Sequence, residues 1–367
     1  MAELQVFWHD DALLHDTGSG VFEHPPSPLI EVSELHPENA VRIQNIRSAL
    51  RNGPISTHLE FREGRHATVD ELATMHDPDY IESVRAFCAD GGGILAWSTV
   101  CVPGSWPAAL SAAGTALRAT EAVLDGETKL AYALVRPPGH HAQPATTDGY
   151  CLFGNTAIAA EAARRRGVER VAIIDWDVHH GNGTQECFYD RADVLAISLH
   201  MPHGSWSEAH PQTGSYLEVG IGPGAGRNVN IELPYGSGDA AYLAAMEQVV
   251  APVVDAFHPD LVMVAAGQDA SQFDPNGRQC VAMAGFRGMG AIARSLADRH
   301  SDGRLVLVQE GGYGRSYSGL CMHATLEGVL GTGALLDDPM AFLPDDITRG
   351  DAGIAAARGV LRRYWDI

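Results

Sequence analysis

The chain has 367 residues, 45% of them hydrophobic, with 40 glycines and 20 prolines. This composition is typical of a globular protein with many loops and excludes a disordered or fibrous chain. The net charge of −21, from 25 basic and 46 acidic residues, argues against a nucleic-acid-binding surface, which needs a basic stripe. An acidic surface could attract cationic substrates such as polyamines or lysine-rich tails, although solubility alone is the simpler reason for it.

The N-terminal stretch and the cysteines predict a cytoplasmic protein. The opening sequence MAELQVFWHDDALL lacks the basic segment and apolar core of a signal peptide. No apolar run approaches the roughly 20 residues that span a bilayer, so we expect no membrane partner. The six cysteines are scattered without CxxC spacing, and we expect reduced thiols in place of a disulfide framework or a zinc knuckle.

Short apolar runs rich in β-branched residues predict buried parallel strands at 130–135, 170–175, 194–199, 261–266 and 304–309. Between them, alanine-rich stretches predict helices, of which the clearest lie at 155–167 and 240–257. The alternation of strand and helix predicts an α/β fold with one open parallel sheet and helices on both faces. There is no internal repeat or low-complexity linker, and we expect a single domain over residues 1–367.

Polar groups follow four of the predicted strands directly. They are RPPGHH at 136–141, DWDVHH at 175–180, GQD at 267–269 and EGGYG at 310–314. In open α/β sheets the chemistry gathers beyond the carboxyl ends of the strands. We therefore expect the four groups to converge on one pocket.

Asp177 and His179 are two positions apart in an extended segment, so their side chains point the same way. Asp269 can supply a third metal ligand from another strand end. Two carboxylates and one imidazole leave one coordination position open, as in catalytic zinc sites. Zinc is the first choice, and the oxygen ligands leave iron(II), cobalt(II) and manganese(II) open. Asp175 lies deeper in the strand and is better placed to hydrogen-bond a histidine.

The pair His140-His141 suits proton transfer, because imidazole titrates near neutral pH. The preceding PPG sequence allows a sharp bend, so that both rings can face one ligand. Tyr313, on a Gly-Gly loop, can donate its hydroxyl to an oxyanion. Together with a metal that polarises a carbonyl and binds water, these groups predict metal-assisted hydrolysis.

Six segments together resemble a known motif set: RPPGHHA, GYCLFGNTAIAA, DWDVHHGNGTQ, ISLH, GQDAS with FDP, and QEGGY. They look like the motifs of the histone-deacetylase superfamily, and are most similar to those of bacterial class II histone-deacetylase-like amidohydrolases and acetylpolyamine amidohydrolases. The resemblance spans roughly residues 10–330, in the family's order. It implies the arginase/deacetylase fold, with an eight-stranded parallel sheet between helices.

The resemblance also implies a role for each polar group. Zinc would be held by the three ligands inferred above, and His141 would be the general base that activates water. His140 would act electrostatically or help to protonate the leaving amine, with Asp175 hydrogen-bonded to it. Asn182 would orient His141, where class I relatives carry Asp, and Tyr313 would bind the oxyanion.

Members of the family also hold a structural potassium ion near the zinc, and they are often dimers or tetramers. The potassium ligands implied in this sequence are the side chains of Asp175 and Ser198 and the backbone carbonyls of Asp177, His179 and Leu199. We accordingly expect zinc and potassium as cofactors and a homo-oligomer as the assembly.

Family members line the acyl tunnel with two aromatic rings. Phe153 matches one of them, but His210 stands where the second is usually Phe. Gln268, a position often aromatic or Leu in the family, and Asp148, before GYC, add polarity. Gly311 completes the predicted substrate contacts. We therefore expect a pocket more polar than a tunnel for a lysine chain.

The rim loop at 90–106 offers no carboxylate after Asp90, whereas many protein deacetylases clamp the peptide backbone with an acidic rim residue. We therefore expect hydrolysis of an acetyl or short acyl group from a small-molecule amine, such as an acetylpolyamine. A protein acetyl-lysine substrate stays open, with a neighbouring loop supplying the clamp. Further alternatives are a non-catalytic protein that binds metal or an acyl ligand, and a two-manganese, arginase-like site, which needs Asp where this chain has His180 and Asn182.

Overall fold

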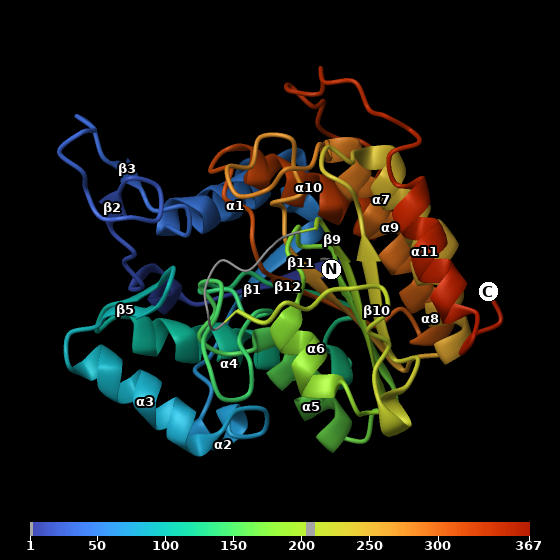
Figure 1. Cartoon of the computed structure of the whole chain (residues 1–367), viewed down its shortest axis with the longest axis horizontal. Helices are drawn as coiled ribbons and strands as arrows, with labels where there is room; N and C mark the ends of the chain where they lie inside the picture. The colour runs from blue at the N-terminus through green and yellow to red at the C-terminus, as the bar shows by residue number, and fades with distance from the viewer. Residues whose placement is uncertain (1–2, 203–209) are drawn as a thin grey trace.

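One parallel sheet of eight strands forms the centre of the molecule (Figure 1). We describe it from a computed structural model that places residues 3–202 and 210–367. The strand order is β10-β9-β8-β11-β12-β7-β1-β4, and all pairings are parallel. The strands are β1 (Leu4–Trp8), β4 (Leu59–Glu63), β7 (Leu130–Ala133), β8 (Val171–Asp175), β9 (Val194–His200), β10 (Asn228–Glu232), β11 (Leu261–Ala266) and β12 (Leu305–Gln309). The predicted α/β fold with an open eight-stranded parallel sheet is confirmed.

The five strands predicted from apolar runs are all present, and three further strands complete the sheet. β10 has the sequence NVNIE, and its Asn228 and Asn230 are buried with their amide groups bonded to Gln185 Oε1. β4 is an edge strand whose residues are half-buried or exposed. Polar residues thus interrupt the apolar pattern in β10 and β4, which is why the sequence does not predict them.

Each strand sends alternate side chains into two layers of helices. In β8, Ala172 and Ile174 join the core on one face, while Val171 and Ile173 join the core on the other. The first face is covered by α1 (Ala40–Asn52), α7 (Asp239–Ala245), α8 (Ala251–Phe257), α9 (Met283–His300), α10 (Tyr317–Leu330) and α11 (Asp351–Leu361). The second is covered by α4 (Ser105–Leu124), α5 (Asn155–Arg165) and α6 (Asn182–Phe188) (Figure 1).

The predicted helix at 240–257 forms as α7 and α8 with a π-helical turn, Met246–Val250, between them. Pro252 has no amide hydrogen to donate to the preceding turn, and a π turn accommodates this loss. The run Asp239–Phe257 is long and apolar enough to span a membrane by length and composition alone. Half of it is buried, and Tyr242, Val249 and Val253 contribute to the core, as in a core helix of a folded domain.

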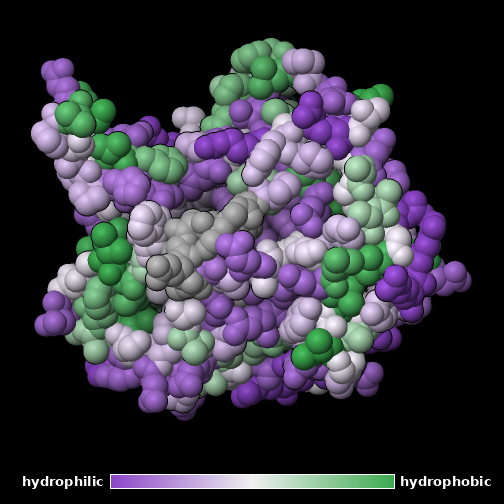
Figure 2. Space-filling view, in the orientation of Figure 1, coloured by the Kyte–Doolittle hydropathy of each residue, from purple (hydrophilic) through white to green (hydrophobic). Residues whose placement is uncertain are grey.

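Smaller elements lie around the sheet. An arm at residues 19–35 begins and ends with β2 (Ser19–Gly20) and β3 (Glu34–Leu35) and projects from the body (Figure 1). The remaining elements are α2 (Val69–Leu72), α3 (Pro78–Ala89), β5 (Gly93–Ala96), β6 (Thr99–Cys101) and the 3-10 helices Asp10–Leu13, Pro54–His58 and Gly222–Gly224. Figure 2 shows a largely polar face, as the many acidic residues predict. All six cysteines are free thiols, as expected.

Candidate active site

The predicted polar groups meet at the carboxyl edge of the sheet. Asp175 is the last residue of β8, Asp269 comes three residues after β11, and Tyr313 four residues after β12. One ligand atom from each of Asp177, His179 and Asp269 lies within 4.8 Å of the other two. Because β8, β11 and β12 are adjacent or next-but-one in the sheet, their ends bring these distant residues to one point.

Backbone amides fix the three side chains of this cluster in place. The amide of Gly311 donates to Asp177 Oδ2 at 2.7 Å, and the amide of Val178 donates to Asp269 Oδ1 at 2.8 Å. The Nδ1 of His179 lies 3.2 Å from both Asp177 Oδ1 and Asp269 Oδ2. The three side chains therefore already point at a common centre.

The charge distribution of the cluster fits a divalent cation. Burial and the nearby carboxylate of Asp177 raise the pKa of Asp269 to about 8. Burial opposes a charge on His179, but its bonds to both carboxylates outweigh this effect and raise its pKa to about 10. The cluster thus has two buried carboxylates and only one imidazole whose positive charge can balance them. This donor set, with two oxygens and one nitrogen, is of the kind that holds a catalytic zinc ion.

His140 and His141 have opposite electrostatic surroundings. The Nδ1 of His140 lies 2.9 Å from Asp175 Oδ2, and the Nδ1 of His141 lies 2.6 Å from Asn182 Oδ1. Burial acts to lower the pKa of His140, but the two carboxylates beside it raise it well above its usual value. Burial and the charges of two neighbouring histidines lower the pKa of His141 well below that value. These surroundings favour the protonated form of His140 and the neutral form of His141, which is the form that can accept a proton.

Asn182 connects His141 to a buried acidic residue. Its Nδ2 donates to Asp148 Oδ2 at 3.2 Å, and the same oxygen lies 2.5 Å from His210 Nδ1. The rings of His210 and His141 lie 6.3 Å apart, centroid to centroid. The sequence indicated that positions 148 and 210 make the pocket polar, but it did not predict that they pair. Their pairing anchors the amide that orients His141.

Glu310 is absent from the predicted site residues, yet it shapes the turn that carries His140. Its carboxylate accepts hydrogen bonds from the backbone amides of Gly139, at 2.6 Å, and His140, at 3.0 Å. Arg42 donates to the carbonyl of Glu310 at 3.0 Å. Burial raises the pKa of Glu310 to about 7, despite the positive charge of His140 nearby. The signal in the sequence was its place at the start of the EGGYG segment.

Tyr313 borders a cavity of about 90 Å³ together with His141 and His179. Burial raises the pKa of Tyr313 well above its usual value, so its phenol keeps the proton that it would donate to an oxyanion. The other lining residues are ones that the sequence does not predict: Glu23, Ser98, Gly149, Tyr150 and Asn276. The cavity is thus partly built by loops outside the four strand ends.

A carboxylate from the projecting arm lies in the wall of this cavity. The hydroxyl of Tyr150 donates to Glu23 Oε1 and accepts from Asn276 Nδ2 at 2.9 Å. The ring of Tyr150 stands edge-on to that of Tyr313, with centroids 5.5 Å apart. The rim loop at 90–106 has no carboxylate after Asp90, and the arm supplies one in its stead.

The prediction for Phe153 is corrected by the structure. The ring of Phe153 does not line the cavity but packs in a buried cluster with His76, Tyr80 and Trp106. Gly149 and Tyr150 both have positive φ angles, 47° and 68°. This turn places Tyr150 at the cavity, so that Tyr150 is the aromatic residue of the wall.

Gln268 and Gly311 also differ from their predicted roles as substrate contacts. The side-chain amide of Gln268 is fully buried and bonds to the carbonyl of Ala266 at 2.5 Å and to Gln309 at 2.9 Å. Gly311 uses its amide to hold Asp177. Neither lines the cavity, because one side chain is occupied within the core and the other residue supports a ligand.

The predicted potassium ligands surround the end of β8. Asp175 and Ser198 are paired in register between β8 and β9, and both line a hollow of about 10 Å³, near the size of one water molecule. Leu199 follows Ser198 within β9. The ring of His180 turns to Gln185, with Nε2 3.0 Å from Oε1, and Asn182 bonds His141. An arginase-like second metal therefore gains no ligand from positions 180 and 182.

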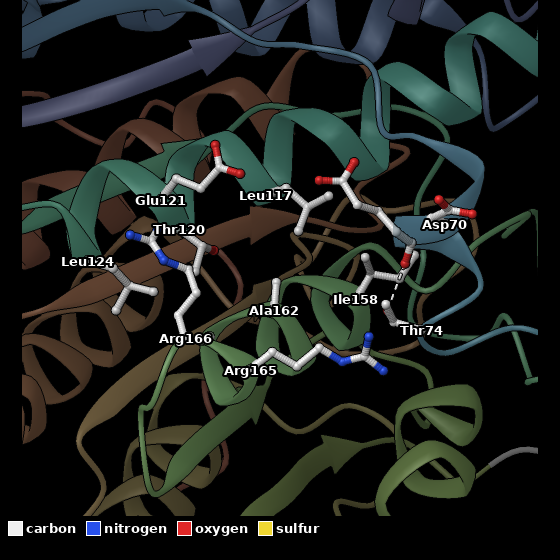
Figure 3. A pocket seen from close by; sticks show the side chains of 12 residues that line it. Asp70, Thr74, Leu117, Thr120, Glu121, Leu124, Ile158, Ala162, Arg165 and Arg166 are labelled. Atoms are coloured by element: carbon white, nitrogen blue, oxygen red, sulfur yellow. Dashed lines mark hydrogen bonds between the residues drawn. The ribbon is translucent and has the colours of Figure 1, made fainter.

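A larger and more apolar hollow, of about 360 Å³, lies between α2, α4 and α5 (Figure 3). Leu117, Leu124, Ile158 and Ala162 line it, with Arg165 at its edge. The described residues that line it include the carboxylates Asp70, Glu71 and Glu121 but no imidazole, no phenol and no member of the Asp177, His179 and Asp269 cluster. The smaller cavity beside Tyr313 combines an imidazole, a phenol and a residue of that cluster, and it is therefore the candidate active site.

Comparison with known proteins agrees with this geometry. The model of the histone deacetylase domain family matches residues 36–329. The chain belongs to the histone deacetylase family. It is 48% identical to "Histone deacetylase 8" of Arabidopsis thaliana over 97% of this chain and 95% of that protein. It is 41% identical to "Histone deacetylase-like amidohydrolase" of Pseudomonas aeruginosa, over 93% of this chain and 90% of that protein.

Among solved structures, the crystal structure of the HDA15 HD domain matches with a TM-score of 0.84 and 30% identity. The match covers 100% of this chain and 96% of that chain. The fold is therefore that of the deacetylases, and the chain is a deacetylase-family hydrolase.

Proposed function

We propose that the protein is a zinc-dependent amidohydrolase that removes an acetyl or similarly short acyl group from a small cationic amine. The observation that carries this proposal is one cavity of about 90 Å³ that holds His141, His179, Tyr313 and the carboxylate of Glu23. A cavity of this size holds several water molecules and suits a short acyl group.

The described residues divide the chemistry between them. Asp177, His179 and Asp269 would hold the zinc ion, which supplies Lewis-acid polarisation of the amide carbonyl and of the attacking water. His141 is neutral at neutral pH and takes the proton of that water, with its ring held by Asn182.

The two remaining groups act on the opposite side of the carbonyl and on the leaving amine. Tyr313 donates its hydroxyl to the carbonyl oxygen as negative charge develops there. His140, beside Asp175, carries a proton whose positive charge stabilises the charge that develops on that oxygen. In the later step it can pass this proton to the departing amine. A non-catalytic binding protein would not need this complete set.

Glu23 is the basis for the proposed amine. The side chain is held by the hydroxyl of Tyr150 at the cavity wall, so that its charge faces an entering substrate. A cationic amine a few bonds from the scissile amide would pair with it. The net charge of −21 would attract the same substrates from a distance. An acetylpolyamine has both features.

A second candidate function is deacetylation of acetyl-lysine in proteins. A groove of about 360 Å³ adjoins the cavity at Tyr313 and is lined by apolar side chains, among them Phe22, Phe273 and Met340, together with one acidic residue, Glu34, and one basic residue, Arg315. Such a groove could receive a peptide on either side of an acetyl-lysine. Relatives of this chain in Arabidopsis thaliana and Oryza sativa are named histone deacetylases, which favours the same function.

The two candidates are separated by a substrate panel assayed on the zinc-loaded protein. We would compare kcat/KM for N-acetylputrescine, N-acetylbutylamine, which has the same length without the charge, and an acetyl-lysine peptide. The proposal predicts that N-acetylputrescine is the best of the three by at least tenfold. A higher kcat/KM for the peptide would establish the second candidate and contradict the first.

Glu23→Gln then tests the source of the preference. We expect it to raise the KM for N-acetylputrescine about tenfold, the effect of one rim charge pair, and to leave N-acetylbutylamine unchanged. Glu31→Gln is the matched control, since Glu31 is an exposed carboxylate of the same arm. An equal effect of both variants would show that overall charge, and not Glu23, sets the preference.

We propose a structural potassium ion at Asp175 and Ser198, and zinc over iron(II) or cobalt(II) as the catalytic ion. Cytoplasmic location, a homo-oligomeric assembly and the absence of nucleic-acid or membrane partners stay predictions.

A further inference from the structure

We propose that a second divalent transition-metal ion, of the zinc or nickel type, binds to His9, Asp11 and His66, outside the catalytic centre. One ligand atom from each of these residues lies within 4.8 Å of the other two. His9 comes directly after β1, and His66 comes three residues after β4. The cluster thus lies at the carboxyl edge of the same sheet, beyond its two outermost strands on that side. This inference does not depend on the proposed function.

The two imidazoles converge on one carboxylate oxygen. His66 Nε2 lies 2.7 Å from Asp11 Oδ2, and His9 Nδ1 lies 3.9 Å from the same atom. The two rings lie against each other, with centroids 4.8 Å apart. Ligands of a tetrahedral zinc ion at about 2.0–2.1 Å stand roughly 3.4 Å from one another, so the distances require only small shifts of these side chains. His9 Nδ1 accepts a hydrogen bond from the amide of Asp11 at 3.2 Å, and an ion bound at this atom would replace that bond.

The backbone that carries the three ligands is anchored on α4. A Cβ at Gly114 of α4 would clash with the backbone at Arg65 and His66, and one at Gly104 would clash with the carbonyl of Leu14. Only glycine permits such close packing at these two points. The amide of Gly64 also donates to the carbonyl of Trp8 at 2.8 Å, which ties the end of β4 to the end of β1. The ligands are therefore presented by segments with fixed positions.

The ion pairs of Asp11 are those with the two histidines, His9 and His66. Arg65, next to His66 in the chain, pairs with Glu71 and Glu121, and Arg47 pairs with Asp10. The ligands are between 22% and 40% exposed, so an ion can enter without opening the fold. Two imidazoles and one carboxylate favour zinc, nickel or copper over calcium or magnesium, which prefer oxygen ligands.

The test is a calorimetric titration of zinc chloride into protein that already carries one zinc ion per chain. We expect one further ion per chain. In His66→Ala the dissociation constant of this ion should rise at least tenfold, and Asp11→Asn, which keeps the size of the side chain, should do the same. His58→Ala is the matched control, because His58 pairs with Glu3 at 2.8 Å with a similar exposure but has no second histidine.

Three outcomes would overturn the proposal. They are no second ion in the wild-type protein at millimolar zinc, a change of less than tenfold in both His66→Ala and Asp11→Asn, and an equal loss in His58→Ala. Asp269→Ala separates the two sites, because it should lose the catalytic ion and keep the second one.

Discussion

Two clusters of aspartate and histidine lie at the same edge of one sheet, yet their surroundings differ. Asp177, His179 and Asp269 follow the central strands β8 and β11 and are nearly or fully buried. His9 and Asp11 follow the outer strand β1, and their cluster is partly exposed. Residue type alone therefore does not make a catalytic site. The position of a cluster along the sheet determines how deeply its residues are buried.

The difference extends to the groups that hold each cluster. In the central cluster, backbone amides bond to the carboxylates, and neighbouring carboxylates and histidines set the protonation of each group. In the outer cluster, the backbone amide of Asp11 donates a hydrogen bond to His9 Nδ1 at 3.2 Å. We infer that the central cluster binds its ion tightly and acts on it, whereas the outer one exchanges its ion with solvent.

The largest expected effect comes from removing a ligand of the central cluster. Asp269→Ala should lose the catalytic metal and all measurable hydrolysis, because two ligands remain of three. Metal analysis and an activity assay on the same sample would check this, with a circular dichroism spectrum to show that the variant folds. Asp11→Asn is the counterpart in the outer cluster and should keep full activity. A fully active Asp269→Ala would refute the ligand assignment.

Tyr313→Phe should lower kcat by roughly 10²–10³, the cost of losing one donor to an oxyanion. Its metal content should stay at the wild-type value, since Tyr313 is not a ligand. Tyr317→Phe serves as the control, because the hydroxyl of Tyr317 bonds to Asp338 at 2.6 Å, outside the cavity. Loss of zinc from Tyr313→Phe would show that its role is structural.

Asn182→Ala should lower kcat/KM by about 10–100-fold, in the range found when a group that orients a functional histidine is removed. The physical reason is that the ring of His141 loses its bond at 2.6 Å and its fixed orientation. Steady-state kinetics on a zinc-replete sample would measure it. An unchanged kcat/KM would mean that Asp148 and the backbone hold the ring without Asn182.

The pH dependence of kcat/KM should reflect the lowered pKa of His141. The usual pKa of histidine is 6.5. Because the pKa of His141 is lowered, His141 remains neutral, and therefore active as a base, when the pH falls to 6.5. We therefore expect kcat/KM to be flat from pH 8 to 6.5 and to fall only below that. A loss of half the activity at pH 6.5 would show that the base titrates normally.

The smallest effect is expected at the outer cluster. His66→Ala should change kcat by less than twofold, because this cluster shares no residue with the cavity beside Tyr313. The same variant should lose the second ion. A large drop in kcat would mean that the two clusters are coupled through α4 or the arm.

The sequence predicts the strands that contain an uninterrupted apolar run, and it misses β10, in which polar and apolar residues alternate. β11 is apolar throughout, β8 is apolar up to its last residue, Asp175, and both were predicted to within one residue. β10 contains Asn228 and Asn230, whose amides bond to Gln185 on another element. Such a partner, more than 40 positions away, leaves no local signal.

The same distinction holds within the active site. The metal ligands were predictable because each follows an apolar strand in a fixed order. Glu23 was not, because the arm brings it to Tyr150 from 127 positions away. Nor could spacing show that the positive φ at Gly149 and Tyr150 turns Tyr150, and not Phe153, to the cavity.

The central claim is that residues 177, 179 and 269 hold one catalytic metal ion. Diffraction from crystals grown with zinc, recorded at the zinc absorption edge, tests this claim most directly. We predict a strong anomalous peak within bonding distance of the side chains of residues 177, 179 and 269, facing the phenol of residue 313. A map with no peak at that position, or with the ion bound to other side chains of the cavity, would contradict the account.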